Sequence, residues 1–183
     1  LREVWRRWCR LRTRTGPGLS PAEETAFKEA VAAHQRNDFK TAVDRYQRVL
    51  ANHPDHLDAR HLLGLARYQA GDLRGGLHHI HRAIGQYPEG YSFFSNFGNI
   101  LYDLGRLPAA TDAYRRAVAL NPDHAVSHYN LANALKDAGA LTPAEASYRE
   151  ALKRVPDYPE ALNNLGNALA DAGLIDEAVA GYR

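Results

Sequence analysis

The feature that most constrains this chain is a strict repetition with a period of 34 residues, which runs without insertion from residue 23 to the end. Five series of like residues keep this step. They are prolines (Pro54, Pro88, Pro122, Pro156), glycines (Gly71, Gly105, Gly139, Gly173), two series of small residues (Gly64, Gly98, Ala132, Gly166 and Ala42, Gly76, Ala110, Ala144, Ala178) and a mostly aromatic series (Tyr46, Ile80, Tyr114, Tyr148, Tyr182). A fixed period of this length indicates stacked supersecondary units rather than one globular core.

Each series has a physical role that divides the repeat into two helices. The prolines mark where a second helix has ended, because proline cannot continue a helix. The glycines follow the first helix, where a left-handed residue closes its C-terminus, and Asn37 takes this place in the first repeat. The small residues let the two backbones approach closely. The sequence therefore predicts antiparallel helix pairs joined by short turns.

These residues resemble the tetratricopeptide repeat (TPR) family, whose 34-residue unit is a helix–turn–helix. The resemblance implies an all-α fold, a right-handed α-α superhelix or TPR solenoid of antiparallel helix pairs. It covers an array over residues 20–183, with repeats at 23–56, 57–90, 91–124 and 125–158 and a truncated fifth at 159–183. Arg60 and Arg67 stand where the family usually has large apolar groups. We expect their stems to pack and their charged heads to reach water.

The two ends of the array carry separate expectations. Ser20, followed by proline and by glutamate at position 23, reads as a capping box that starts the first helix. Residues 1–19 are predicted to form a basic amphipathic helix followed by a Gly/Pro hinge. We favour a cap on the first repeat for this helix, and docking on a partner or on an anionic membrane surface are the alternatives.

The last repeat stops in the middle of its pattern, at Arg183. Repeat arrays normally end with an atypical helix that has a polar outer face. We therefore expect the parent chain to continue with more repeats, another domain or both. Whether the uncapped C-terminal repeat drives self-association is left open by the sequence.

A string of asparagines recurs on the first helices of three repeats. Asparagines three apart share a helix face, and an aspartate four residues later continues the stripe. The candidate peptide-binding residues are Asn96, Asn99, Asn130, Asn133, Asn164, Asn167, Asp103, Asp137 and Asp171. An amide offers both a donor and an acceptor, so a row of amides can bracket the backbone of an extended peptide. The alternative is that each asparagine only ties one repeat to the next.

The stretch at 130–139, Asn-Leu-Ala-Asn-Ala-Leu-Lys-Asp-Ala-Gly, is similar to the repeats of O-GlcNAc transferase and its bacterial relatives. The resemblance implies that an asparagine ladder holds protein substrates for a glycosyltransferase domain that follows the repeats. It carries over to Asn96, Asn130 and Asn164, with Asn99, Asn133 and Asn167 as neighbours. The first two repeats depart from this pattern. The alternative function is a stand-alone TPR adaptor or assembly scaffold with no attached enzyme.

Other functional classes find little support in the sequence. The formal charge of +2 does not favour a nucleic-acid partner, and no apolar run approaches the length of a membrane span. Cys9 is the single cysteine, so we expect a reducing, cytoplasmic location. We expect no catalytic residue in this segment, no cofactor and no metal. His78, His79 and His81 lack further ligands at a suitable spacing, and we interpret them as a solvated second-helix surface.

Overall fold

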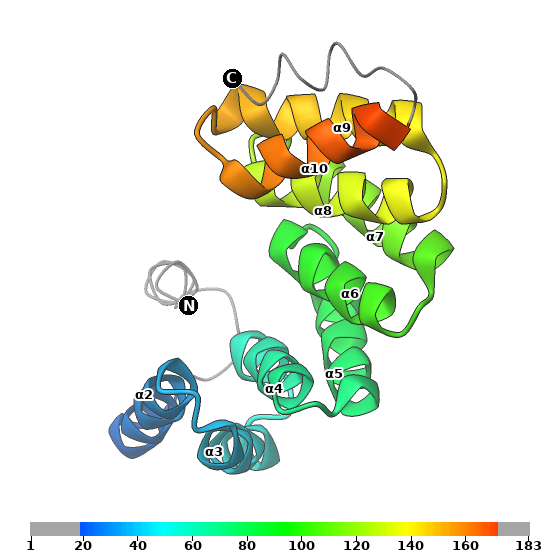
Figure 1. The fold of residues 1–183 in the computed structure, drawn as a ribbon. Coiled ribbons are helices and arrows are strands. Elements are labelled where there is room, and N and C mark those ends of the chain that lie inside the picture. Colours follow the sequence, from blue (N-terminus) through cyan, green and yellow to red (C-terminus); the bar gives the residue numbers. More distant parts are fainter. Residues whose placement is uncertain (1–18, 172–183) are drawn as a thin grey trace. The chain divides into compact units, whose positions relative to one another are not determined.

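The structure, a computed structural model, describes residues 19–171, and within that range the chain consists of helices joined by short turns (Figure 1). The predicted N-terminal amphipathic helix and hinge, and the second helix of the fifth repeat, lie outside the described residues. The helices are α2 (Pro21–Gln35), α3 (Phe39–Asn52), α4 (Leu57–Gln69), α5 (Leu73–Gln86), α6 (Tyr91–Asp103), α7 (Leu107–Leu120), α8 (Ala125–Asp137), α9 (Leu141–Arg154) and α10 (Pro159–Asp171).

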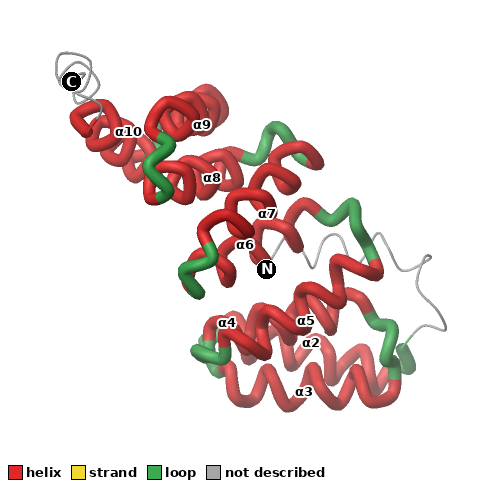
Figure 2. The backbone as a smooth tube through the Cα atoms, turned by 90° about the vertical axis from the view of Figure 1, so that its right-hand side faces the viewer, coloured by secondary structure: helices red, strands yellow, loops and turns green. Residues whose placement is uncertain are grey.

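The helices fall into two compact units, one ending at Pro88 and one beginning at Glu89. In the first unit α2 packs on α3, α3 on α4 and α4 on α5. In the second unit each helix from α6 to α9 packs on its successor, and Figure 2 shows α8, α9 and α10 side by side. The helices α4, α6 and α8 begin at the residues where their repeats were predicted to start. The prediction of an all-α array of antiparallel helix pairs is confirmed.

Side-chain caps fix where the helices of the first unit begin. The backbone N–H of Glu23 donates to the Ser20 hydroxyl, and the Glu23 carboxylate accepts from the Ser20 backbone N–H at 2.9 Å. This is the predicted capping box, which satisfies two of the unpaired donors at a helix start. Asp38 and Asp72 cap α3 and α5 in the simpler way, each accepting from a backbone N–H three residues later.

The first helices end in left-handed residues, as the sequence predicted. Asn37 has φ 62°, and the glycines at its equivalent positions, Gly71, Gly105 and Gly139, have φ between 71° and 88°. An L-residue with a side chain is strained in this conformation, whereas glycine adopts it readily and asparagine tolerates it. The turn between the two helices of each repeat is therefore encoded by one residue.

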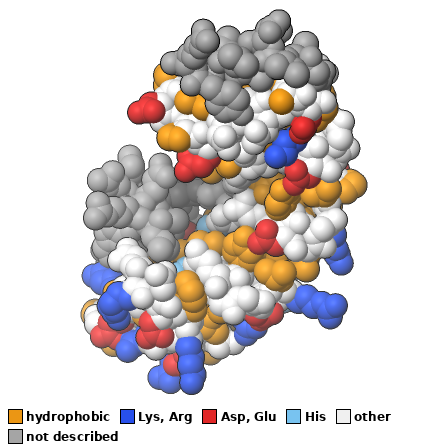
Figure 3. Space-filling model, viewed as in Figure 1, with side chains coloured by type: hydrophobic (Ala, Val, Ile, Leu, Met, Phe, Trp, Pro, Cys, Tyr) orange, Lys and Arg blue, Asp and Glu red, His pale blue; other side chains and the backbone are white. Residues whose placement is uncertain are grey.

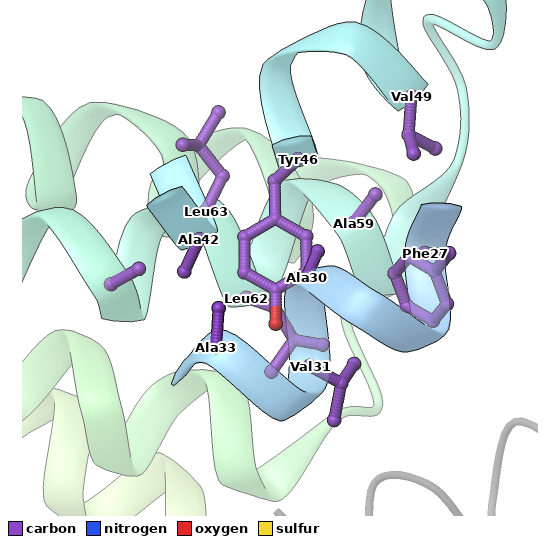
Figure 4. Packing of buried hydrophobic residues seen from close by; sticks show 11 residues of the cluster. Phe27, Ala30, Val31, Ala33, Ala42, Tyr46, Val49, Ala59, Leu62 and Leu63 are labelled. Carbon is purple, nitrogen blue, oxygen red and sulfur yellow. The ribbon is translucent and has the colours of Figure 1, made fainter. Parts of the chain in front are cut away.

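A continuous apolar core joins α2, α3 and α4 (Figure 4). Tyr46 of α3 is completely buried and lies between residues of α2, such as Ala30 and Ala33, and Leu62 and Leu63 of α4. Alanines on the neighbouring helices leave the volume that the tyrosine ring fills. A single α3 side chain thus contributes to the packing of three helices, and this is why a hairpin of this kind needs a neighbour for stability.

The predicted close approach of small residues is confirmed between α4 and α5. A Cβ atom on Gly64 would lie 2.6 Å from Ile80 Cγ1, and one on Gly76 would lie 2.9 Å from the Gly64 carbonyl oxygen. Neither position has room for a side chain unless the helices separate. The glycine pair therefore sets the distance between the two helices of the second repeat.

The outer surface of the first hairpin is charged, and Figure 3 shows basic and acidic side chains mixed over α2 and α3. The ion pairs Arg45–Glu29 and Arg48–Asp44 lie there, the second at 2.9 Å. Exposed pairs of this kind contribute little to stability, about 0–1 kcal/mol each.

One expectation about side-chain exposure is wrong. The head of Arg60 does not reach water: the residue is 5% exposed, and its guanidinium donates to the Pro54 carbonyl oxygen and, at 3.1 Å, to Gln86 Oε1. Arg67 is half-buried and is paired with Asp72 at 2.8 Å. The arginines were expected to behave as snorkelling side chains. Instead, hydrogen-bond acceptors near α4 hold the Arg60 head inside the hairpin, whereas the Arg67 head pairs with an exposed carboxylate, as a packed stem with an exposed head would.

Candidate functional site

The predicted asparagines of the second unit lie on α6, α8 and α10. Four of them, Asn99, Asn130, Asn133 and Asn164, are half-buried and form one connected series across the three helices, which we call the amide row. Asn96 is also half-buried, whereas Asn167 is exposed.

The first junction of the amide row joins the third and fourth repeats. Asn130 of α8 donates through Nδ2 to Asn99 Oδ1 of α6 at 3.0 Å. The hydroxyl of Tyr114, on α7, donates to the same Asn99 oxygen at 2.8 Å. Both lone pairs of one carbonyl oxygen are therefore used, one within the repeat and one from the next repeat.

The second junction repeats this arrangement 34 residues later. Asn164 of α10 donates to Asn133 Oδ1 of α8 at 3.0 Å, and Tyr148 of α9 donates to the same oxygen at 2.6 Å. Asn164 has one more contact, since its Nδ2 also donates to the Tyr129 hydroxyl at 3.1 Å. We call each three-residue arrangement an asparagine joint. Two joints in register show that these amides tie neighbouring repeats together.

The joints leave part of each amide unused. Within the described residues, the Nδ2 groups of Asn99 and Asn133 make no hydrogen bond, and neither do the Oδ1 atoms of Asn130 and Asn164. None of these atoms is among the buried polar atoms that lack a partner. These four atoms therefore remain accessible to water. Each joint thus has one unused donor, an Nδ2 group, and one unused acceptor, an Oδ1 atom. Use of this surface by a guest chain stays a prediction.

The predicted aspartates are placed differently from one another. Asp137, at the end of α8, accepts a hydrogen bond from the Tyr102 hydroxyl of α6 and so links the third and fourth repeats a second time. Burial, and then this hydrogen bond, raises the pKa of Tyr102 to about 12. Asp103 and Asp171 are exposed at the C-terminal ends of α6 and α10. Asp137 therefore binds across a repeat boundary.

The first unit has a contact in the same register. His34, equivalent to Tyr102, lies with Nε2 2.6 Å from Gln69 Oε1, and Gln69 is equivalent to Asp137. A carbonyl oxygen accepts only, so Nε2 carries the proton and Nδ1 faces the Tyr46 hydroxyl at 3.4 Å. Sequence reasoning missed this pair. The signal was a donor and an acceptor 35 residues apart at the same repeat position.

Aromatic rings lie next to the second joint, and two of them, Tyr129 and Tyr158, were not singled out from the sequence. The Tyr129 ring centroid is 5.0 Å from that of Tyr158 and 6.1 Å from that of Tyr148. Burial raises the pKa of both Tyr148 and Tyr158, so these two phenols stay neutral and can donate hydrogen bonds at neutral pH. The amide row is therefore bordered by apolar ring surface as well as by carboxylates.

Metal and membrane sites can be assessed for the described residues only. In residues 19–171 no group of three or more histidine, cysteine or acidic side chains could hold a metal ion. No helix in the same range is long and apolar enough to cross a membrane. His78 and His81 are exposed, as expected. The interpretation is wrong for His79, which is half-buried with its Nδ1 atom buried, because its side of α5 packs against α4.

Comparison with known proteins agrees with the repeat. A family model described as tetratricopeptide repeat matches residues 27–88 and 129–183, and one described as TPR repeat matches residues 98–139. No curated protein matches the chain.

Solved structures show the same fold at low sequence identity. A crystal structure of MamA is 22% identical with a TM-score of 0.80, covering 87% of each chain. MamA 41-end from Desulfovibrio magneticus RS-1 is 14% identical with a TM-score of 0.83, covering 90% of this chain and 93% of that one. YrrB, a TPR protein with an unusual peptide-binding site, is 18% identical with a TM-score of 0.73, covering 85% and 80%.

Proposed function

Because the chain belongs to the tetratricopeptide repeat family, we propose that its second unit binds an extended polypeptide along the amide row of α6, α8 and α10. A protein-interaction role is what the TPR fold supports, and the amide row gives that role a location. The observation that carries the proposal is the unused donor and acceptor beside each asparagine joint.

The chemistry of the amide row suits a peptide backbone. The free N–H groups of Asn99 and Asn133 can donate to peptide carbonyl oxygens, and the free Oδ1 atoms of Asn130 and Asn164 can accept from peptide N–H groups. The joints hold the four side chains in place, so little rotamer entropy is lost on binding. Backbone recognition of this kind makes few demands on the partner's sequence, and the neighbouring tyrosine rings add apolar contact area.

This proposal can be tested by replacing the outward Nδ2 groups of Asn99 and Asn133 while the hydrogen bonds of each asparagine joint are kept. Asn99→Asp together with Asn133→Asp retains the oxygen that accepts from the tyrosine and from the next asparagine, but it replaces the outward N–H by an oxygen. A peptide selected on the wild-type chain from a random 12-residue display library serves as the probe, and fluorescence anisotropy measures its binding. We expect at least a tenfold loss of affinity and a melting temperature close to that of the wild type.

The matched control removes a joint bond and keeps the outward groups. Tyr114→Phe with Tyr148→Phe deletes the two hydroxyl donors, which costs about 1 kcal/mol of unfolding free energy each. Peptide affinity should stay within about twofold at a temperature where the variant is folded. The proposal fails if the aspartate variant binds the peptide like the wild type. The proposal also fails if the peptide affinity of both variants falls in proportion to the loss of their melting temperature.

We further propose that this array recognises substrates for an O-GlcNAc transferase-like glycosyltransferase in a reducing, cytoplasmic compartment. The support is the asparagine string of residues 130–139, which is similar to the repeats of that enzyme family. The alternative is a stand-alone adaptor or assembly scaffold with no attached enzyme. The gene sequence beyond Arg183 separates the two: a nucleotide-sugar transferase domain supports the first, and a stop codon or further repeats alone support the adaptor.

A further inference from the structure

The second repeat carries charged residues where the third and fourth repeats carry apolar or small ones. Arg67 of α4 occupies the position of the buried Leu101 and Leu135, and His79 of α5 occupies the position of the buried Ala113 and Ser147. The neighbouring Gly75 provides the space, because a Cβ atom there would lie 2.8 Å from Arg67 Nη1. Two polar side chains, Arg67 and His79, have thus taken positions that are apolar or small in the next two repeats, and the charge of Arg67 acts on His79.

Both members of this pair have a buried polar atom whose hydrogen-bonding capacity is unused. Arg67 Nη1 donates to Asp72 Oδ2 at 2.8 Å, but within residues 19–171 neither Arg67 Nε nor His79 Nδ1 has a hydrogen-bond partner. About 90% or more of buried polar groups in folded proteins are paired, so two such atoms in one hairpin call for an explanation. Both atoms can donate to an oxygen, His79 Nδ1 when it carries a proton.

Positive charge dominates the surroundings of these atoms. The buried Arg60 guanidinium donates to two neutral acceptors, the Pro54 carbonyl and Gln86. Burial first, and then the charges of Arg67, His78, Arg60 and Arg82, lower the pKa of His79 to about 4. Asp72 is the carboxylate that pairs with Arg67, and the charge of His79 also acts on it. Asp55 also acts on the buried Arg60, so two carboxylates, Asp55 and Asp72, face three arginines and one histidine.

We propose that Arg60, Arg67, His79 and Arg82, the arginine–histidine cluster, form a binding site for an oxyanion, such as the phosphate or carboxylate group of a ligand. The anion's oxygens accept from Arg67 Nε and from protonated His79 Nδ1, and its charge balances the arginines. Since the anion favours the charged imidazole, binding takes up a proton between the lowered pKa of His79 and neutral pH. The site lies in the first unit and does not depend on the peptide-binding proposal.

Isothermal titration calorimetry of the whole chain with sodium phosphate at pH 6 tests the site, with sodium chloride at equal ionic strength as the reference. We expect saturable binding whose enthalpy changes with the ionisation enthalpy of the buffer, as proton uptake requires. NMR of the His79 imidazole should show its titration midpoint rising by at least one pH unit when phosphate is present. Sodium acetate in a parallel titration distinguishes a carboxylate ligand from a phosphate ligand.

The variant Arg67→Leu with His79→Ala installs the residues that the third hairpin has at these positions. It should fold with an equal or higher melting temperature and lose phosphate binding by at least tenfold. Arg74→Ala, an exposed arginine of the same hairpin, is the control and should bind within twofold of the wild type. The proposal is overturned if neither anion binds above the chloride reference, if the double variant binds as well as the wild type, or if the His79 midpoint does not move.

Discussion

Left-handed residues are the clearest case in which single residues of this sequence specify structure. Gly71 and Gly85 both have open space around a hypothetical Cβ atom, but only Gly71 has a positive φ, of 88°. Gly71→Ala should therefore lower the unfolding free energy by about 1–2 kcal/mol through backbone strain. Gly85→Ala, inside α5, should raise it by about 0.5–1 kcal/mol. Urea denaturation measures the unfolding free energy of both variants, and changes of the same sign would contradict the account.

The buried histidine of α2 gives a pH-dependent prediction. Burial lowers the pKa of His34 below 6.5, so the unfolded chain takes up a proton first as the pH falls. The contribution of His34 to the unfolding free energy is therefore complete above pH 6.5, and it is lost as the pH falls below this value. His56 and His79 act in the same direction. His34→Gln keeps a donor for Gln69 but cannot titrate, so the fall in unfolding free energy from pH 7 to pH 5 should be smaller than in the wild type.

This prediction can be refuted by an unchanged pH slope in the His34→Gln variant. Measurement above pH 5 keeps Glu23 and Glu150 out of the comparison, because hydrogen bonds lower the pKa of each to about 2. The burial of His34 was not foreseen from the sequence. Its position holds Tyr68 and Tyr102 in later repeats, and the histidine fits because Gln69 Oε1 of the next repeat accepts a hydrogen bond from its Nε2–H.

At the scale of elements, helix boundaries were largely predictable because each is set by local chemistry. The capping box at the start of α2 yields a further prediction. The Ser20 backbone N–H and then the Ser20 hydroxyl hold the pKa of Glu23 at about 2; Ser20→Ala removes the hydroxyl and keeps the N–H, so this pKa should rise part of the way toward 4.5. The amides of the first α2 turn should also exchange hydrogen faster. NMR titration of the Glu23 carboxyl carbon measures the first effect, and an unchanged pKa would refute the cap's role.

The role of the asparagines in the joints could not be predicted from the sequence. The sequence located the amides on one face of the first helices, and it raised both a peptide-binding and a repeat-tying role for them. It could not decide between these roles, because the choice depends on the reach of Tyr114 and Tyr148 from the second helices. Contacts between side chains 15 and 31 residues apart follow from packing geometry rather than from local patterns.

At the scale of the whole molecule, stability is a sum of hairpins and of the contacts that couple them. Asn133→Ala removes the oxygen that serves both Tyr148 and Asn164, leaving two donors without their acceptor. We expect a loss of about 1–3 kcal/mol, concentrated where the fourth repeat meets α10. Hydrogen exchange should speed up in α10 and leave α6 and α7 nearly unchanged. A uniform increase throughout the second unit would argue against the joint as a local coupling.

The central claim is that the amides that join neighbouring repeats also offer their outward groups to a guest chain. NMR of the side-chain amide groups of Asn99 and Asn133 tests it directly during titration with a library-selected peptide. The account predicts that these two Nδ2 signals shift in proportion to the bound fraction, while the joint hydrogen bonds persist. Signals that stay unmoved at saturation, with shifts confined to other residues, would contradict it.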